Sequence, residues 1–526
     1  MIASKASRMV AAGTVALLVV GVNPPAALAI TPPKIDPAMV PGDGPPGPEQ
    51  AMRQAGRCRS AVASPRPDVT LPAPGYDMLN IAQAWRHSTG NGVQVAVIDS
   101  GVNPSPRLRL VAGGDYVQGG DGLSDCDVHG TVVAAIIAAA PQGSAMPPPM
   151  PPGRTRVPLD KNLVPPPNIP PPNIPPTNAP PPTAAPTETL NPRGAAAPQV
   201  GPVGPAANPV PADGLAGVAP HATVIAIRQS SDLFRPANPS TDDAESGERA
   251  GTVATLARSI VHAANLGAAV INVSVTACIS AADPVDLRAL GAAVWYAATV
   301  KDAVVVAAAG NEGQDGCSQN PVFDPLNTED PRDWRQVKTV SAPSLFSDYV
   351  LSVGAVDTTG APIGASLAGP WLGVAAPGVG IVGLAGAAGG AVNAYAPARP
   401  GEPSVPFSGT SFSAAYVSGV AALVRAKYPE LSAHQVIHRI QQTAHNPPRG
   451  IDNQVGFGVV DPVAALTFDV PPGERVAPGS QTRVLAPPPA APPPDHRART
   501  VALLLAGVVA TSALLAAVAA RARRTR

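Results

Sequence analysis

Proline is the residue that most limits how this chain can fold. The 526 residues include 68 prolines, and 25 of them lie in residues 141–211. Proline has no backbone donor for a helix or a sheet, so such a segment is typical of polyproline II or unfolded chain. The run Pro-Pro-Pro-Asn-Ile occurs there twice in succession, from residue 165. We therefore expect residues 141–213 to be a surface insertion in a domain that folds around it.

The rest of the chain has the pattern of a layered α/β domain. Aromatic residues make up only 3% of the chain, so the core must be built from Ala, Val, Ile and Leu. Continuous apolar runs, such as residues 304–309, suit parallel strands that are covered on both faces. We predict a three-layer domain with a central, mostly parallel sheet over residues 77–466, and a strand at residues 215–218 directly after the insertion. The predicted helices are residues 130–140, 252–266, 285–300, 411–428 and 433–444.

The two ends of the chain predict export and membrane anchoring. Residues 1–29 combine early basic residues, an apolar run and Ala-Leu-Ala, which is typical of a secretory signal peptide; the alternative, an uncleaved anchor, has too short an apolar run. Residues 500–520 are long and apolar enough to span a bilayer, and the arginine-rich tail at 521–526 predicts a cytoplasmic C-terminus. A buried globular helix is the alternative, which the proline-rich linker at residues 467–499 disfavours. The protein is thus expected in the cell membrane with a single span, its folded domain on the extracytoplasmic side.

Three short segments supply the residues of a serine nucleophile and its base. Ser411 lies in Phe-Ser-Gly-Thr-Ser-Phe-Ser before an Ala/Val-rich helix, His129 lies in Asp-Val-His-Gly-Thr, and Asp99 ends an apolar run before Ser-Gly. A serine hydroxyl needs an imidazole to take its proton, and a carboxylate can hold that imidazole in the required tautomer. Each motif alone is common in turns and helix caps. Their order and domain-scale spacing indicate a catalytic triad.

An asparagine between the second and third segments completes this set. Residues 304–309 run into Gly-Asn-Glu-Gly, which places Asn311 after an apolar strand. Its amide could donate a hydrogen bond to the developing oxyanion, together with the backbone N–H of Ser411. We therefore predict Asn311 as the oxyanion residue.

With these residues in this order, the chain resembles the subtilisins over approximately residues 77–466. Further segments are similar to subtilisin segments in the same order: residues 218–224, 270–274, 349–356, 374–378 and 456–461. The resemblance implies a serine endopeptidase with a substrate cleft along Ser274, Val275 and Thr276. The chain departs from the usual subtilisin pattern at Val275 and Thr276, where Leu-Gly is preferred, and we expect these side chains to narrow the cleft. It departs also at Val132, in place of a second histidine, and at Ala415, in place of a proline.

The four cysteines of an exported chain fit two disulfides, for which three pairings are possible. We predict Cys58–Cys126, which would tie the N-terminal segment beside His129, and Cys278–Cys317, which would brace the cleft near Asn311. A zinc site is the alternative, but no Cys-x-x-Cys or paired-histidine spacing supports it. We predict no metal site and no cofactor.

The signal peptide, the cysteine-bearing N-terminal segment, the triad, the proline-rich insertion and the C-terminal helix together resemble one branch of the subtilisin family. These are the mycosins, membrane-anchored proteases of actinobacterial type VII secretion. The resemblance implies that residues 30–76 stay attached and wrap the protease domain. It also implies partners, namely components of the type VII membrane complex and secreted protein substrates.

Two function classes follow from this resemblance. The first is an endopeptidase that cleaves secreted proteins; the alternative is a structural component that stabilises the secretion complex, with proteolysis secondary. Lys and Arg together number 36, as do Asp and Glu, so the zero net charge gives no reason to expect nucleic acid binding.

Overall fold

The structure is a computed structural model that separates into two compact units, residues 1–481 and 482–526. It describes residues 33–142, 147–149, 212–238, 250–282, 285–314, 316–322, 332, 334–387, 389–448, 450–478 and 497–524. The predicted signal peptide, most of the insertion and much of the linker lie outside these residues.

The first unit is built on a seven-stranded sheet whose neighbouring strands are all parallel. Its spatial order is β12-β11-β9-β7-β3-β5-β4. The strands are β3 (Gln94–Asp99), β4 (Leu110–Asp115), β5 (Thr223–Arg228), β7 (Val270–Val273), β9 (Val304–Ala308), β11 (Val350–Val356) and β12 (Leu372–Pro377). Since β3 lies between β5 and β7 and is buried along nearly its whole length, its carboxyl end opens at the middle of one sheet edge.

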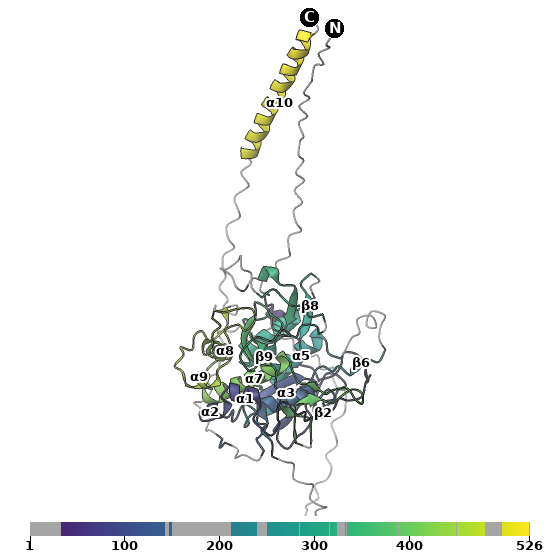
Figure 1. Cartoon of the computed structure of the whole chain (residues 1–526), viewed down its shortest axis with the longest axis vertical. Coiled ribbons are helices and arrows are strands. Elements are labelled where there is room, and N and C mark those ends of the chain that lie inside the picture. Colours follow the sequence, from purple (N-terminus) through teal and green to yellow (C-terminus); the bar gives the residue numbers. More distant parts are fainter. Residues whose placement is uncertain are drawn as a thin grey trace, which may run out of the picture. The chain divides into compact units, whose positions relative to one another are not determined.

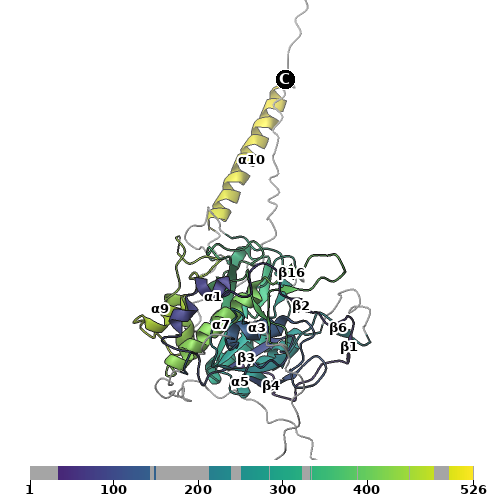
Figure 2. The same ribbon diagram turned by 60° about the horizontal axis from the view of Figure 1, so that its bottom comes forward.

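Helices cover both faces of this sheet, as Figures 1 and 2 show. In β3, Val95 and Val97 pack into the core with helices α3 and α7, whereas Ala96 and Ile98 pack into the core with α5 and α6. This alternation is what a strand buried on both faces requires. The helices of this unit are α1 (Pro74–Met78), α2 (Ile81–Ala84), α3 (His129–Ala138), α5 (Val253–Asn265), α6 (Arg288–Trp295, continued by a π-helical turn Tyr296–Val300), α7 (Thr410–Lys427), α8 (Ala433–Gln442) and α9 (Pro462–Thr467). The predicted three-layer α/β fold is confirmed.

The prediction of a strand at residues 215–218 is wrong. These residues form an irregular segment, and β5 begins only at Thr223. The backbone N–H groups of Gly217, Val218 and Ala219 donate to the carbonyls of Ala139, Ile136 and Ile137. The apolar run therefore satisfies carbonyls at the C-terminal end of α3, which would otherwise lack partners.

The N-terminal segment runs along the outside of the domain and adds two short strands to it. Strand β1 (Met52–Gln54) pairs with β6 (Phe234–Pro236), and β2 (Ala61–Val62) joins β15 (Ala394–Tyr395) and β16 (Val405–Pro406). Figure 2 shows β1, β2, β6 and β16 on one side of the domain. The remaining short pairs are β8 (Ala277–Ser280) with β10 (Thr339–Ala342), and β13 (Gly383–Leu384) with β14 (Ala391–Val392).

Two disulfides join the cysteines in the pairs expected from the sequence. Cys58 is bonded to Cys126, and Cys278 is bonded to Cys317. The first bridge ties the N-terminal segment to the loop before α3. The second ties β8, just beyond the predicted cleft residues, to the turn after β9.

The second unit contains the helix α10 (Arg497–Arg524). Its stretch Leu505–Arg523 is long and apolar enough to cross a membrane by length and composition. This agrees with the predicted span at residues 500–520.

Candidate active site

The carboxyl edge of the central sheet brings the predicted acid and base together. Asp99 is the last residue of β3 and its side chain is 1% exposed, whereas His129 is the first residue of α3 and its side chain is 25% exposed. The Asp99 Oδ1 atom lies 2.7 Å from His129 Nδ1 and also accepts a 2.6 Å bond from the Ser100 N–H. Among the described residues, Asp99 Oδ2 has no hydrogen-bond partner. The contact leaves Nε2 as the ring nitrogen that can act as a base.

Two opposing effects act on the pKa of His129. Burial favours the neutral ring and lowers the pKa, but the carboxylates of Asp99, Asp125 and Asp232 favour the charged ring and outweigh burial. The net result raises the pKa of His129 to about 9.

The predicted nucleophile lies at the start of the long helix α7. Gly409, with φ 136°, precedes the helix, and Ser411 is its second residue. A Cβ at Gly409 would also come within 3.2 Å of the Asn311 amide, so glycine is required both for the turn and for this close approach. The ring of the next residue, Phe412, packs on His129 with 5.2 Å between ring centroids. This ring contact brings the first turn of α7, which carries Ser411, against the residue that pairs with Asp99.

Ser411 is hydrogen-bonded twice to Ser274, the first of the predicted cleft residues. Its hydroxyl donates to the Ser274 carbonyl at 3.0 Å, and the Ser274 hydroxyl donates back to the Ser411 carbonyl at 3.0 Å. Ser274 is itself held by a 2.8 Å bond from Asn272 Nδ2. In this state the Ser411 hydroxyl is thus directed to Ser274 rather than to His129.

Asn311 follows β9 and lies against the turn that carries Ser411. Its Oδ1 accepts from the Thr410 N–H at 3.0 Å and from the Thr410 hydroxyl at 3.3 Å, while its Nδ2 donates to Gln314 Oε1 at 3.1 Å. Because Thr410 donates to the oxygen end of the amide, the nitrogen end is left to donate hydrogen bonds elsewhere. Among the described residues, the second N–H of Nδ2 has no hydrogen-bond acceptor, so it can donate to a substrate oxygen.

The other predicted cleft residues, Val275 and Thr276, connect β7 to β8 and are half-buried. The Val275 side chain packs against the core that contains α5 and α6. Of the three predicted cleft residues, Ser274 is therefore the one that is hydrogen-bonded to Ser411.

Comparison with known proteins identifies the family of this arrangement. The subtilase (peptidase S8) family model matches residues 196–458, a range that includes Asn311 and Ser411. Mycosin-2 of Mycobacterium tuberculosis is 57% identical over 497 residues, covering 91% of this chain and 90% of that protein. Mycosin-5 of the same organism is 48% identical over 502 residues, covering 86% of this chain and 85% of that protein. The chain belongs to the mycosin family.

Solved structures agree with this assignment. MycP1 from Mycobacterium smegmatis aligns with a TM-score of 0.68 at 40% identity, over 87% of this chain and 100% of that chain. A chain of the intact ESX-5 inner membrane complex aligns with a TM-score of 0.68 at 44% identity, over 94% of this chain and 100% of that chain. This mycosin is a serine endopeptidase of the subtilase type.

The structure also reveals polar neighbours of the site that the sequence did not indicate. Ser100 and Asp125 are both buried and lie next to Asp99, and the Thr410 hydroxyl accepts a 3.1 Å bond from the Gly310 N–H. Asp125 precedes His129 by four residues, but an aspartate at that distance is no signal in a single sequence.

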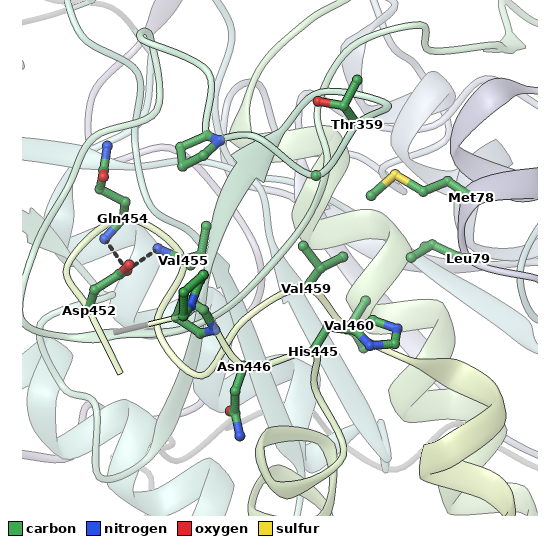
Figure 3. A pocket seen from close by; sticks show the side chains of 14 residues that line it. Met78, Leu79, Thr359, His445, Asn446, Asp452, Gln454, Val455, Val459 and Val460 are labelled. Atoms are coloured by element: carbon green, nitrogen blue, oxygen red, sulfur yellow. Dashed lines mark hydrogen bonds between the residues drawn. The ribbon is translucent and has the colours of Figure 1, made fainter. Parts of the chain in front are cut away.

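A pocket of about 500 Å³ on this mycosin lies elsewhere. Figure 3 shows the apolar side chains of Met78, Leu79, Val455 and Val459 that line it, together with His445. Neither the triad candidates nor Asn311 line it, so it is separate from the site described above.

Proposed function

We propose that Asp99, His129 and Ser411 form the catalytic triad of this mycosin, with Asn311 and the Ser411 N–H as the oxyanion hole. The observation that carries the proposal is the 2.7 Å contact of Asp99 with His129, whose ring packs on the residue next to Ser411. The chain order and the strand and helix ends that carry these residues support it.

In the proposed mechanism, the Ser411 hydroxyl first changes its hydrogen-bond acceptor. Rotation of the Ser411 side chain moves its hydroxyl from the Ser274 carbonyl towards His129 Nε2. The neutral imidazole then takes the proton while the oxygen attacks the substrate carbonyl, and the imidazolium later gives the proton to the leaving amine. Water repeats the sequence to release the acyl group from Ser411.

Two charges develop in the transition state, one on the His129 imidazolium and one on the oxyanion, and the site can stabilise both. Asp99 stabilises the imidazolium, since its carboxylate is already bonded to Nδ1. The oxyanion lies at the N-terminus of the 18-residue helix α7, where free N–H groups and the helix dipole favour negative charge. Asn311 adds a donor whose orientation Thr410 fixes beforehand, and removing such a donor costs roughly a hundred- to a thousand-fold in rate.

The same proposal extends to the place of action. An exported chain with α10 as a single span and a cytoplasmic arginine-rich tail would keep the protease domain on the extracytoplasmic side. MycP1 is described as part of the ESX-1 type VII secretion system, and another neighbour is a chain of an ESX-5 inner membrane complex. By similarity, this mycosin associates with components of a type VII membrane complex and cleaves secreted protein substrates.

A structural role in that complex is the second candidate function. It is favoured by the alignment over 94% of this chain with a component of an assembled inner membrane complex. In that case the triad would process substrates while assembly of the complex depended on the rest of the protein.

One pair of variants separates these functions. Ser411→Ala removes the proposed nucleophile, whereas Ser413→Ala removes a buried hydroxyl on the same helix that donates to Pro377. We expect a fluorophosphonate probe to label wild type and Ser413→Ala but not Ser411→Ala. Labelling of Ser411→Ala at the wild-type rate would contradict the triad.

The same variants then complement cells that lack the protein. Failure of Ser411→Ala to restore type VII secretion would make proteolysis the essential activity. Restored secretion with an uncleaved substrate would make the structural role essential.

A further inference from the structure

A second buried carboxylate lies next to the proposed triad. Asp125 is 5% exposed and belongs to the loop that leads into α3. Its Oδ1 accepts from the Ser100 hydroxyl at 2.9 Å and from the Asp127 N–H at 3.0 Å, and its Oδ2 accepts from the Thr131 N–H at 2.8 Å and hydroxyl at 2.6 Å. The mechanism above assigns no task to this group. A buried carboxylate with four donors is nevertheless held in one place.

Ser100 connects this carboxylate to the triad. Its hydroxyl lies 3.1 Å from Asp99 Oδ1 and 2.9 Å from Asp125 Oδ1, and it accepts a 3.0 Å bond from the Gly130 N–H. One hydroxyl thus contacts the triad acid, the second carboxylate and the residue after His129. Because a hydroxyl carries one proton, it can donate to only one carboxylate at a time.

Asp125 also accepts hydrogen bonds from the first turn of α3, the helix that carries His129. Val128, which precedes α3, has φ 70° and provides no side-chain cap. The cap comes instead from Asp125, whose Oδ2 holds Thr131 in the first turn. The loop itself is fixed, since Asn103 bonds both the N–H and the carbonyl of Asp125 at 2.9 Å. Asp125 is therefore linked to Asp99 through Ser100, and to the helix that carries His129 through Thr131.

We propose that Asp125 is a positioning residue of the triad, which holds Asp99 through Ser100 and holds His129 through the first turn of α3. The inference rests on the proposed triad, because it assigns Asp125 a task only if Asp99 and His129 are the acid and the base. Asp125 touches neither the nucleophile nor the cleft.

The electrostatics of the site agree with this role. The charged groups around the imidazole are Asp99 on β3, Asp125 in the loop before α3, and Asp232 after β5, which pairs with Arg59. Burial raises the pKa of Asp125 to about 7, against the bonds from Thr131 that lower it. Asp125 thus adds negative charge near His129 when it is ionised.

Asp127 provides a matched control. It is also buried and lies two residues from Asp125 and from His129. Its carboxylate accepts instead from the Ser231 hydroxyl and the Asp232 N–H. It is not among the groups with the largest effects on the pKa of His129.

The test measures fluorophosphonate labelling of the full-length protein in detergent, as a function of probe concentration and of pH. We expect Asp125→Asn to lower the maximal labelling rate about tenfold, the loss of one bond to a charged group, with the half-saturating probe concentration unchanged. The acid limb of the Asp125→Asn pH profile, in which the labelling rate rises as His129 loses its proton, should move to lower pH. The reason is that the loss of a neighbouring negative charge lowers the pKa of His129. Ser100→Ala should lower the same maximal rate, and the double variant should lose no more than the stronger single variant. Asp127→Asn should match wild type in rate and in pH profile.

Two results would overturn the inference. One is an Asp125→Asn protein whose rate and pH profile match those of Asp127→Asn. The other is an Asp125→Asn protein that is labelled slowly but keeps the wild-type pH profile, together with a Ser100→Ala protein that is labelled at the wild-type rate. That combination would indicate a packing effect alone. Ser100→Ala keeps the test valid if Asp125→Asn does not fold. If His129→Ala and Ser411→Ala label as wild type does, the triad itself is wrong, which is a separate outcome.

Discussion

We predict that the carboxylates around His129 set the pH range in which this protease is active. In the proposed triad, the ring must be neutral to accept a proton from Ser411, and the pKa of His129 is raised to about 9. We therefore expect the second-order rate constant of fluorophosphonate labelling to rise with pH and to reach half of its plateau near pH 9. Measurement between about pH 5 and about pH 10.5 tests this, because that range extends about 1.5 units beyond both the ordinary pKa of 6.5 and the raised pKa of about 9. A midpoint near 6.5, the ordinary pKa of histidine, would show that the carboxylates do not outweigh burial.

The same residues make folding stability depend on pH. The pKa of Asp125 is raised from 3.8 to about 7 and that of His129 from 6.5 to about 9, so the folded state binds both protons more tightly than the unfolded state. The stability that these protons add is present at low pH and is lost as pH rises through the two folded-state values. The two shifts together extend from pH 3.8 to about pH 9. We therefore expect Tm to fall by several degrees over about that range, measured by differential scanning fluorimetry. Asp125→Asn should reduce the fall of Tm in the lower-pH half of this range. A wild-type Tm that rises with pH across the range would contradict the prediction.

At the residue scale, the candidate site residues that could be predicted from the sequence are those that lie in short, recognisable motifs. Ser411, His129, Asp99 and Asn311 each follow or begin an element with a recognisable apolar pattern, and the fold brings them to one edge of the sheet. The partners of these groups were not predictable. The contact of Ser100 with Asp125 spans 25 residues and depends on how a loop folds back, which no local pattern encodes. The bonds between Ser274 and Ser411 span 137 residues.

At the element scale, the two disulfides serve different parts of the molecule. Cys58–Cys126 closes a sequence separation of 68 residues and ties down the N-terminal segment, whereas Cys278–Cys317 joins β8 to the turn beside Asn311. We expect replacement of both cysteines of the first pair by Ala to cost about 2–4 kcal/mol of unfolding free energy, chiefly by freeing the unfolded chain. Its labelling rate should stay at the wild-type level.

The second pair is the natural comparison for the first. Cys278→Ala with Cys317→Ala should lower the labelling rate as well as Tm, because the turn that presents Asn311 loses its brace. Equal effects of the two double variants on the labelling rate would contradict this division of roles.

The insertion between α3 and β5 is held at its base by one buried arginine. The Arg107 guanidinium donates to the carbonyls of Ala140 and Leu215 and forms a 2.8 Å ion pair with Asp213, so both ends of the insertion meet at one side chain. We expect replacement of residues 143–211 by a short Gly-Ser linker to leave Tm and the labelling rate near wild type. Arg107→Ala should instead cost about 3–5 kcal/mol, because it leaves Asp213 buried without its partner. Loss of folding on deletion of the insertion would show that it contributes to the core.

Elements with a strong apolar pattern were predicted to within a few residues, as with α5, α7 and α8. The exception at residues 215–218 shows the limit of such patterns. The apolar run next to the insertion predicts a strand, but in the structure its backbone N–H groups donate hydrogen bonds to the carbonyls of α3. Hydrogen bonds to a helix end depend on tertiary contacts, so the composition of the segment could not distinguish the two outcomes.

At the scale of the whole molecule, the proposed catalytic residues and the candidate membrane span belong to separate units. All of the proposed catalytic residues lie in the unit of residues 1–481, and the candidate span lies in the unit of residues 482–526. We expect a chain that ends at residue 478 to appear in the soluble fraction after export, and to be labelled at the rate of the full-length protein. The full-length protein should sediment with membranes. Leu514→Arg combined with Val509→Arg gives a full-length control, since each arginine near the middle of a span costs about 2.5–3.5 kcal/mol of insertion free energy. Retention of both altered proteins in the membrane fraction would show that the protease domain, rather than α10, holds the protein there.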